Sequence, residues 1–150
     1  MESSVNNLVI RKIRAEDADA INSIQTSITK SSEKTDFRNI IGEQVRKNED
    51  ISFAAEIDGK IVGYMISYTI YGGFGLDKSA WISTLGVDPK YMGQGIGKKL
   101  AEEIVQVYRE KGIRYIFTTV RWDSVDLLSF FKTLGFDRSN FINLRKELDS

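Results

Sequence analysis

The chain has 150 residues, of which 41% are hydrophobic and 28% charged, so we expect a single globular domain over residues 1–150 with one core. Lys and Arg together number 21, as do Asp and Glu, so no net charge favours nucleic acid or an anionic membrane as a partner. The absence of Cys and His excludes thiol nucleophiles, Ser-His-Asp triads, disulfides and thiolate or imidazole metal sites, and we expect no metal.

The start of the chain, MESSVNNLVIRKIRAEDAD, lacks the apolar stretch of a signal peptide. The apolar runs farther along are too short to span a bilayer. We therefore expect a cytoplasmic protein with no membrane partner.

The first part of the chain predicts one strand and then two helices. Residues 8–13 are typical of a strand, and acidic residues follow where a helix would begin. Isoleucines then recur at helical spacing at 21, 24 and 28. A polar break over residues 31–35 precedes a second apolar stripe at helical spacing, formed by Phe37, Ile40, Ile41 and Val45.

A hairpin and a central strand should follow. Residues 52–57 and 60–70 are rich in strand-forming residues, and Asp58-Gly59 between them is the two-residue signal for a type I′ turn. Residues 71–78 have turn chemistry and no period. Residues 80–87 are apolar on both faces apart from small Ser and Thr, which suits a strand covered on both sides.

The last part predicts helix, strand, helix and strand. An apolar stripe that includes Ile96, Leu100, Ile104 and Tyr108 indicates a helix that stops at Lys111-Gly112. Next come a strand over residues 115–122 and a helix that Asp123 or Ser124 can cap and Gly135 closes. Residues 141–148 alternate as a final strand.

The stretch VDPKYMGQGIGKKL, residues 87–100, joins the central strand to the helix through three alternate glycines. A strand, a glycine turn and a helix start place free N–H groups and the positive end of the helix dipole toward an anion, most simply a phosphate. The positive charges of Lys98 and Lys99 interact unfavourably with that end of the dipole, at a cost of about 0.3–1 kcal/mol each. A bound anion would offset this cost. Alternatively, the glycines only make a tight turn and these lysines pair with Glu102 and Glu103.

Two familiar phosphate loops do not fit this spacing. A Walker A loop needs Gly at 92 and Ser or Thr at 99, where the chain has Met92 and Lys99. A dinucleotide fingerprint needs Gly at 98, which is Lys98.

The order of elements, with three local motifs, resembles the GNAT superfamily of acyl-CoA-dependent N-acetyltransferases. The motifs are residues 85–89 (LGVDP), 92–97 (MGQGIG) and 130–136 (FFKTLGF). The resemblance covers nearly the whole chain. It implies an α/β (α+β) fold with a mixed, mostly antiparallel central sheet of six to seven strands, flanked by about four helices.

The resemblance also implies a site for acetyl-CoA. The pyrophosphate of coenzyme A would bind backbone amides of Gly93, Gln94, Gly95, Ile96, Gly97 and Lys98. Leu85, Gly86 and Val87 would pair through their backbone with the pantetheine arm and orient the thioester carbonyl. Ser124 stands where many members have an Asn that touches the cofactor.

Two departures from the family pattern concern the chemistry. Met92 replaces the usual Gln or Arg at the first loop position, which leaves the backbone amides in place. Phe131 replaces the Tyr that in many members protonates the departing thiolate, and no acidic residue lies within residues 80–87.

No catalytic residue is assigned from the sequence. Glu56, Asp77, Tyr68 and Tyr71 are candidate bases, although each carboxylate also fits a solvated turn or loop and the tyrosines also fit sheet packing. The acceptor should lie between the segments 31–36 and 71–78, which the fold constrains least.

The leading hypothesis is an N-acetyltransferase that transfers an acetyl group from acetyl-CoA to a primary amine of a small molecule or peptide, by direct attack in a ternary complex. The alternatives are a catalytically weak acyl-CoA-binding or regulatory module and a binding domain without cofactor. A homodimer is one option for its assembly, and no nucleic-acid partner is expected.

Overall fold

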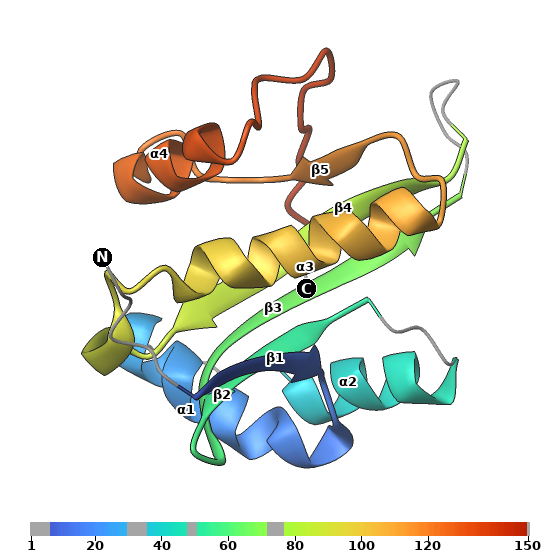
Figure 1. The fold of residues 1–150 in the computed structure, drawn as a ribbon. Helices are drawn as coiled ribbons and strands as arrows, with labels where there is room; N and C mark the ends of the chain where they lie inside the picture. The colour runs from blue at the N-terminus through green and yellow to red at the C-terminus, as the bar shows by residue number, and fades with distance from the viewer. Residues whose placement is uncertain (1–6, 30–35, 48–50, 72–76, 150) are drawn as a thin grey trace. The chain divides into compact units, whose positions relative to one another are not determined.

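The computed structural model describes residues 7–29, 36–47, 51–71 and 77–149 (Figure 1). It divides into two compact units, Met1–Thr119 and Val120–Ser150, and each is considered by itself. The expectation of a single domain over the whole chain stays a prediction. The first unit holds the sheet and three α-helices, and the second holds one α-helix.

The sheet runs in chain order, β1-β2-β3-β4-β5. Its strands are β1 (Leu8–Lys12), β2 (Phe53–Ile57), β3 (Lys60–Ile70), β4 (Ser79–Val87) and β5 (Ile116–Thr118). The first four are antiparallel to their neighbours, and β5 lies parallel to β4. A mixed, mostly antiparallel sheet is therefore confirmed.

The β2–β3 hairpin has the backbone that its sequence predicts. Asp58 has a φ of 51° and Gly59 a φ of 82°, and a type I′ turn requires a positive φ at both positions. This tight turn sets the two strands side by side, with Ile57 opposite Lys60.

Helices cover both faces of the sheet in the first unit. They are α1 (Ala18–Thr29), α2 (Phe37–Arg46) and α3 (Ile96–Glu110), with short 3₁₀ turns at Ala15–Asp17 and Pro89–Tyr91. Tyr64 of β3 packs in a cluster with residues of α1 and α2, whereas the adjacent Gly63 faces Ile96 and Leu100 of α3. Because successive strand residues face opposite sides, α3 lies on the face opposite α1 and α2.

The second unit contains α4 (Val125–Thr133), which makes four α-helices in the described residues, as expected. Its C-terminal end closes as predicted at Gly135, which has a φ of 92°.

Two predicted strands are corrected. The strand expected over residues 115–122 is limited to Ile116–Thr118, and residues 141–148 form no strand, so the described sheet has five strands rather than six or seven. A strand requires a neighbour for its backbone groups, and the described part of the second unit contains none. Ile142 and Leu144 are accordingly each 85% exposed.

The predicted break at residues 31–35 and most of the predicted 71–78 loop, residues 72–76, lie outside the described residues. Within the described ranges, the helices are either too short or too polar to cross a bilayer.

Candidate functional site

The start of α3 is built on two glycines in the left-handed region. Gly93 has a φ of 82° and Gly95, the N-cap residue, a φ of 81°. A Cβ added at either position would meet no atom within 4 Å. The backbone conformation, rather than close packing, therefore favours glycine here, and the space beside both residues is open.

Backbone N–H groups at this turn are free to bind a ligand. From Gly93 to Lys98 none has a hydrogen-bond partner among the described residues, and the first that does is the N–H of Lys99, which donates to the Gly95 carbonyl at 3.1 Å. The N-cap has no side-chain hydrogen bond. Free donors at the positive end of a 15-residue helix favour an anion.

The turn is held against the sheet by short contacts. The N–H of Asp88 donates to the Val62 carbonyl at 2.8 Å, and the Asp88 carboxylate accepts from the N–H of Lys90 at 3.0 Å. A Cβ on Gly63 would lie 3.1 Å from Cγ2 of Ile96. Gly63 thus allows the first turn of α3 to approach β3 closely, a role that the sequence indicated only through an isolated glycine in a strand.

The second half of β4 has a free edge. β5 pairs with Ala80–Ile82 only, so from Ser83 to Val87 the side of β4 turned away from β3 has no strand partner in the described parts of the chain. Leu85, Gly86 and Val87, the residues predicted to contact an extended ligand, lie on this segment. An extended chain with amide groups can add to such an edge as a strand does.

Gly86 is required by close packing. A Cβ there would lie 2.8 Å from Cε1 and 2.9 Å from the hydroxyl oxygen of Tyr64, a fully buried residue. Burial raises the pKa of Tyr64, and a hydrogen bond with Thr84 lowers it by less. The tyrosine is therefore a neutral packing group beneath the free edge.

Two hydroxyl groups lie where β4 and β5 separate. Thr118 Oγ1 donates to the Ile82 carbonyl at 3.0 Å. On the other side, Ile66 pairs with Thr84 and Ser67 with Ile82, which leaves Ser83 as the extra residue of a β-bulge. Ser83 Oγ donates to the Ile66 carbonyl at 3.2 Å. The local sequence marks neither hydroxyl, because their roles depend on strand register.

Ser124 and Phe131 belong to the second unit. Ser124 is the N-cap residue of α4, without a side-chain cap, and its predicted part in the site stays a prediction. The ring of Phe131 packs edge-on against Phe130 and Phe136, with centroids 5.2 Å and 5.1 Å away. Phe131 thus has an apolar packing role within its own unit.

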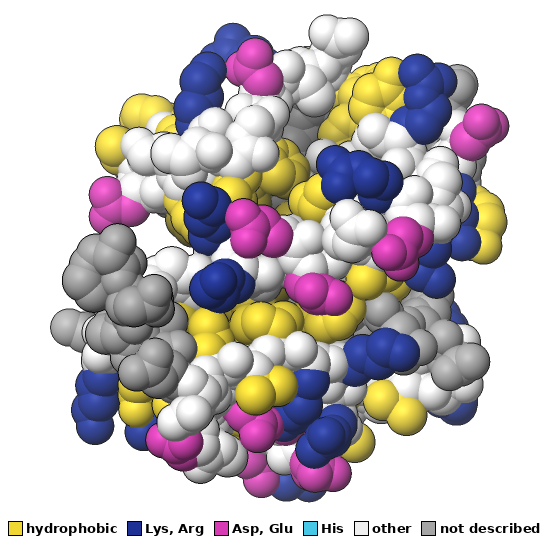
Figure 2. All heavy atoms as spheres, in the orientation of Figure 1, with side chains coloured by type: hydrophobic (Ala, Val, Ile, Leu, Met, Phe, Trp, Pro, Cys, Tyr) yellow, Lys and Arg dark blue, Asp and Glu magenta, His cyan; other side chains and the backbone are white. Residues whose placement is uncertain are grey.

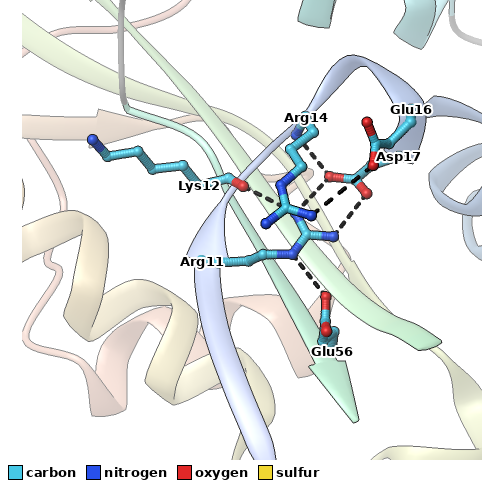
Figure 3. Close-up of polar contacts among 6 residues, drawn as sticks. All are labelled: Arg11, Lys12, Arg14, Glu16, Asp17 and Glu56. Atoms are coloured by element: carbon cyan, nitrogen blue, oxygen red, sulfur yellow. Dashed lines mark hydrogen bonds and ion pairs between the residues drawn. The ribbon is translucent and has the colours of Figure 1, made fainter. Parts of the chain in front are cut away.

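Glu56, one of the candidate bases, is held in an ion-pair network (Figure 3). Arg11 Nε donates to Glu56 Oε1 at 2.7 Å, and both terminal nitrogens of Arg11 donate to Asp17 at 2.9 Å. Burial raises the pKa of Asp17, but hydrogen bonds from Arg11 and from the N–H of Arg14 outweigh it and lower that pKa. This arrangement favours a structural role for Glu56.

The other candidate bases have no arrangement that marks one of them. Tyr71 is 76% exposed, with the Lys78 ammonium 4.7 Å from its ring centroid, and Tyr68 is 38% exposed. Asp77 is exposed beside residues that lie outside the described ranges. No catalytic base is therefore assigned among them.

On the face in view in Figure 2, charge does not form a large electrostatic binding surface. Figure 2 shows Lys and Arg side chains interspersed with Asp and Glu on the face in view. An anion would therefore depend on local groups, such as the free N–H groups at the start of α3.

Comparison with known proteins places these features in a family. The model of the acetyltransferase (GNAT) family matches residues 18–136. An uncharacterized N-acetyltransferase of Methanocaldococcus jannaschii is 26% identical over 99 residues, which cover 65% of this chain and 44% of that protein. The chain thus spans less than half the length of this relative.

Solved structures share the fold. An aminoglycoside acetyltransferase from an uncultured soil metagenomic sample, crystallised with trehalose, gives a TM-score of 0.76 at 24% identity, covering 96% of this chain and 98% of that one. An aminoglycoside N-acetyltransferase in complex with CoA gives a TM-score of 0.74 at 16% identity, and the match covers 98% of this chain and 97% of that one. The mixed sheet with its flanking helices is the fold of these proteins.

Proposed function

The chain belongs to the acetyltransferase (GNAT) family, and from this premise we propose that it is an N-acetyltransferase that uses acetyl-CoA to acetylate a primary amine. The observation that carries the proposal is the continuity of two unpartnered backbone segments. The free edge of β4 ends at Val87, and the free N–H groups of the glycine turn begin at Gly93, six residues later.

The glycine turn is the proposed site for the pyrophosphate. The N–H groups from Gly93 to Lys98 would donate to phosphate oxygens, and the absence of a Cβ at Gly93 and Gly95 leaves room for them. The positive charges of Lys98 and Lys99, unfavourable at a helix start by themselves, would be offset by the ligand. Met92, 54% exposed, contributes no polar group, so its backbone matters more than its side chain.

The free edge of β4 is the proposed site for the pantetheine arm. The arm is extended and carries amide groups, so the backbone of Leu85, Gly86 and Val87 can pair with it as an added strand. An N–H group of the same edge would donate to the thioester carbonyl and stabilise negative charge on its oxygen. Ser124 is retained as a proposed contact from the second unit.

Acetyl-CoA supplies the activated acyl group, and the protein must bring the amine to it in a neutral form. In the direct route, a bond forms between nitrogen and the carbonyl carbon, the carbon–sulfur bond breaks, and the amine proton ends on sulfur. A thiol has a reference pKa of about 8.5, so sulfur can depart without a tyrosine acid at Phe131. An alkyl ammonium has a pKa of about 10.4, so loss of its proton is the harder step.

The acceptor class follows from the relatives only in outline. Two of the similar folds are described as aminoglycoside acetyltransferases, so an aminoglycoside amine is one candidate, and an amine of a peptide is another. The segments predicted to hold the acceptor are largely outside the described residues. Among their described residues, Asp36 accepts from the N–H of Asn39 at 3.1 Å, and the Lys78 ammonium lies 4.7 Å from the ring centroid of Tyr71.

Release of the coenzyme A thiol tests the proposal directly. Acetyl-CoA would be incubated with the protein and, in separate reactions, sisomicin or a peptide with an N-terminal alanine. We expect thiol release that depends on one of the amines, with the acetylated amine detected by mass spectrometry. Binding of acetyl-CoA without release across a wider amine panel would instead indicate a weak acyl-CoA-binding module.

A further inference from the structure

An aromatic row, formed by Tyr68, Trp81 and Phe117, crosses three adjacent strands of the sheet. Tyr68 of β3 is paired with Trp81 of β4, and Trp81 is paired with Phe117 of β5. The rings of Trp81 and Phe117 stack on each other, with centroids 5.1 Å apart. The next pair, Ile82 and Thr118, is the last before β4 and β5 separate, so the row lies beside the point where the free edge of β4 begins.

The row lies on the open face of the sheet at this point. Ser67 Oγ shares a hydrogen bond of 2.7 Å with the Tyr108 hydroxyl of α3, and Ile82 pairs with Ser67, so both residues face α3. Because neighbours in a strand face opposite sides, the row lies on the other face, the one that carries α1 and α2. Ile82 is only 3% exposed, whereas Tyr68 is 38% exposed and Trp81 is partly exposed. A ligand therefore reaches the separation from the face of the row.

The reacting end of the proposed cofactor would lie near this separation. With the pyrophosphate at Gly93–Lys98 and the pantetheine arm along Val87 to Leu85, the thioester end points toward the place where β5 begins to pair. Four residues of strand separate Leu85 from Trp81, a span of at most about 13 Å. An amine whose nitrogen is about 3–3.5 Å from the thioester carbonyl can therefore extend its other atoms over the row.

The charges around the row indicate which kind of amine it suits. β4 and β5 carry no charged residue, and β3 carries only Lys60, at its far end. The described charged residues just before β4 and β5 are one acidic residue, Asp77, and two basic residues, Lys78 and Arg114. A polycation needs several carboxylates, and these strands with the described residues leading into them provide one. Aromatic rings instead favour a flat apolar group that can stack on them.

We propose that the aromatic row binds the body of the acceptor, which is a primary amine attached to an aromatic or other flat apolar group. The inference rests on the proposed function and names the substrate class of the same site. An apolar surface disfavours the charged form of a bound amine and so lowers its pKa, which assists formation of the neutral amine. The transfer is then the one given above: the nitrogen–carbon bond forms, the carbon–sulfur bond breaks, and the amine proton ends on sulfur.

Tryptophan emission tests this binding without any need for acetyl-CoA. The chain has 2 tryptophans, and Trp122 is 85% exposed in the second unit, so Trp122→Phe leaves Trp81 as the sole reporter. This chain would be titrated with phenethylamine and, separately, with ethylamine, the matched amine without a ring. We expect a saturable change in Trp81 emission with phenethylamine at millimolar concentrations and none with ethylamine.

Substitutions within the row and away from it give the matched comparison. Phe117→Leu removes the ring that stacks on Trp81 and should weaken phenethylamine binding on the order of fivefold, the effect of one aromatic contact. Val9→Ala should leave binding unchanged, because Val9 is a 48% exposed apolar residue of β1, at the opposite edge of the sheet. Melting temperatures would verify that each variant folds.

Thiol release connects the row to acetyl transfer. Trp81→Leu should raise the KM of phenethylamine on the order of fivefold and that of ethylamine much less. Its dissociation constant for acetyl-CoA should change less than about twofold, because the row and the glycine turn share no residue.

Other outcomes would overturn the inference. Trp81 emission that phenethylamine leaves unchanged, or that ethylamine changes equally, would show that the row does not bind the ring. Undiminished affinity in a folded Phe117→Leu chain would do the same, and an equal rise in both KM values in Trp81→Leu would make Trp81 a structural residue. Emission that changes on dilution of the protein alone would make the row an interface between copies of the chain.

Failure of the proposed function has a different signature. A wild-type chain that does not bind acetyl-CoA in calorimetric titration would refute the proposed acetyltransferase. The emission titration is independent of that result, since it contains no cofactor.

Discussion

Glycine at position 95 combines a backbone requirement with a ligand requirement, and the two can be separated by experiment. Its φ of 81° strains any residue with a Cβ by about 1–2 kcal/mol, whatever the ligand. Gly112, at the other end of α3, has a φ of 79° and equally open space around it. Because Gly112 is far from the free N–H groups along the helix, it is a matched control for strain.

Gly95→Glu should abolish acetyl-CoA binding, because a side chain and a negative charge would occupy the space proposed for pyrophosphate. Gly112→Glu should lose similar stability and still bind. Calorimetric titration of both variants with acetyl-CoA, alongside denaturant unfolding, makes the comparison. Normal binding by Gly95→Glu would remove the glycine turn from the site.

The buried carboxylate of Asp17 should make stability depend on pH in a defined direction. Its folded pKa is lowered, because hydrogen bonds from Arg11 and Arg14 exceed the opposing effect of burial. Its contribution is therefore fully present above the unfolded pKa of about 3.9 and is lost as the pH falls through the lowered folded value. Asp17 is 4% exposed and Arg11 16%, so solvent screens this pair only in part.

Asp17→Asn should lower the free energy of unfolding at pH 7 by about 1.5–3 kcal/mol, since it weakens the charge-assisted hydrogen bonds from Arg11, which keeps its ion pair with Glu56. The difference in the free energy of unfolding between this variant and wild type should become smaller as the pH falls below about 4. There the wild-type carboxylate becomes neutral, as the Asn side chain already is. Urea unfolding at pH 7 and at pH 3 measures both differences. A difference that is the same at both pH values would contradict the assigned role of the ion pair.

At the scale of elements, β4 depends on close contact with β3 and α1. A Cβ on Gly86 would meet the ring of Tyr64 at 2.8 Å and Cδ1 of Ile28 at 3.0 Å. Tyr64 is itself fixed by an edge-on contact with Phe37, with centroids 5.7 Å apart. The tyrosine cannot move aside cheaply, so a larger residue at 86 must displace β4.

Gly86→Ala should therefore destabilise the fold by about 1–3 kcal/mol through overpacking, and should weaken acetyl-CoA binding because the free edge shifts. The control is Gly42→Ala in α2, where an added Cβ meets nothing within 4 Å and helix propensity favours alanine by about 1 kcal/mol. Thermal unfolding with and without acetyl-CoA separates the two effects. A Gly86→Ala chain as stable as wild type would show that the contact with Tyr64 relaxes freely.

Local chemistry explains which elements could be predicted from the sequence. Asp58-Gly59 specifies its own turn, and the apolar stripe of α3 specifies a helix without reference to the rest of the chain. The strand expected over residues 141–148 shows the limit of this reasoning. Alternation marks a segment that can form a strand, but the partner that would make it one depends on distant segments.

The candidate site likewise has one part that the local sequence specifies and one part that depends on distant segments. The glycine turn was predictable, because a strand, glycines and a helix start follow one another in the sequence. The separation of β4 from β5 was not predictable from the sequence. It depends on a bulge opposite Ile66 and on the register that brings Thr118 to Ile82. Ser83 acquires its place from that register, and nothing in the local sequence distinguishes it from other strand serines.

On the scale of the whole molecule, the proposed binding residues are divided unequally between the two units. The glycine turn, the free edge of β4 and the aromatic row all lie in the first unit, Met1–Thr119. The family match, residues 18–136, extends into the second unit as far as Phe136. Binding of acetyl-CoA therefore tests the best-defined part of the proposal, with the full chain as the sample.

The most direct measurement is the stability of the full chain with and without acetyl-CoA. A ligand that binds only the folded state at one hundred times its dissociation constant should raise the free energy of unfolding by about 2.7 kcal/mol. We predict this increase for the wild-type chain and for Gly112→Glu, and no increase for Gly95→Glu. A folded wild-type chain whose stability is unchanged at millimolar acetyl-CoA would contradict the proposed acetyl-CoA site.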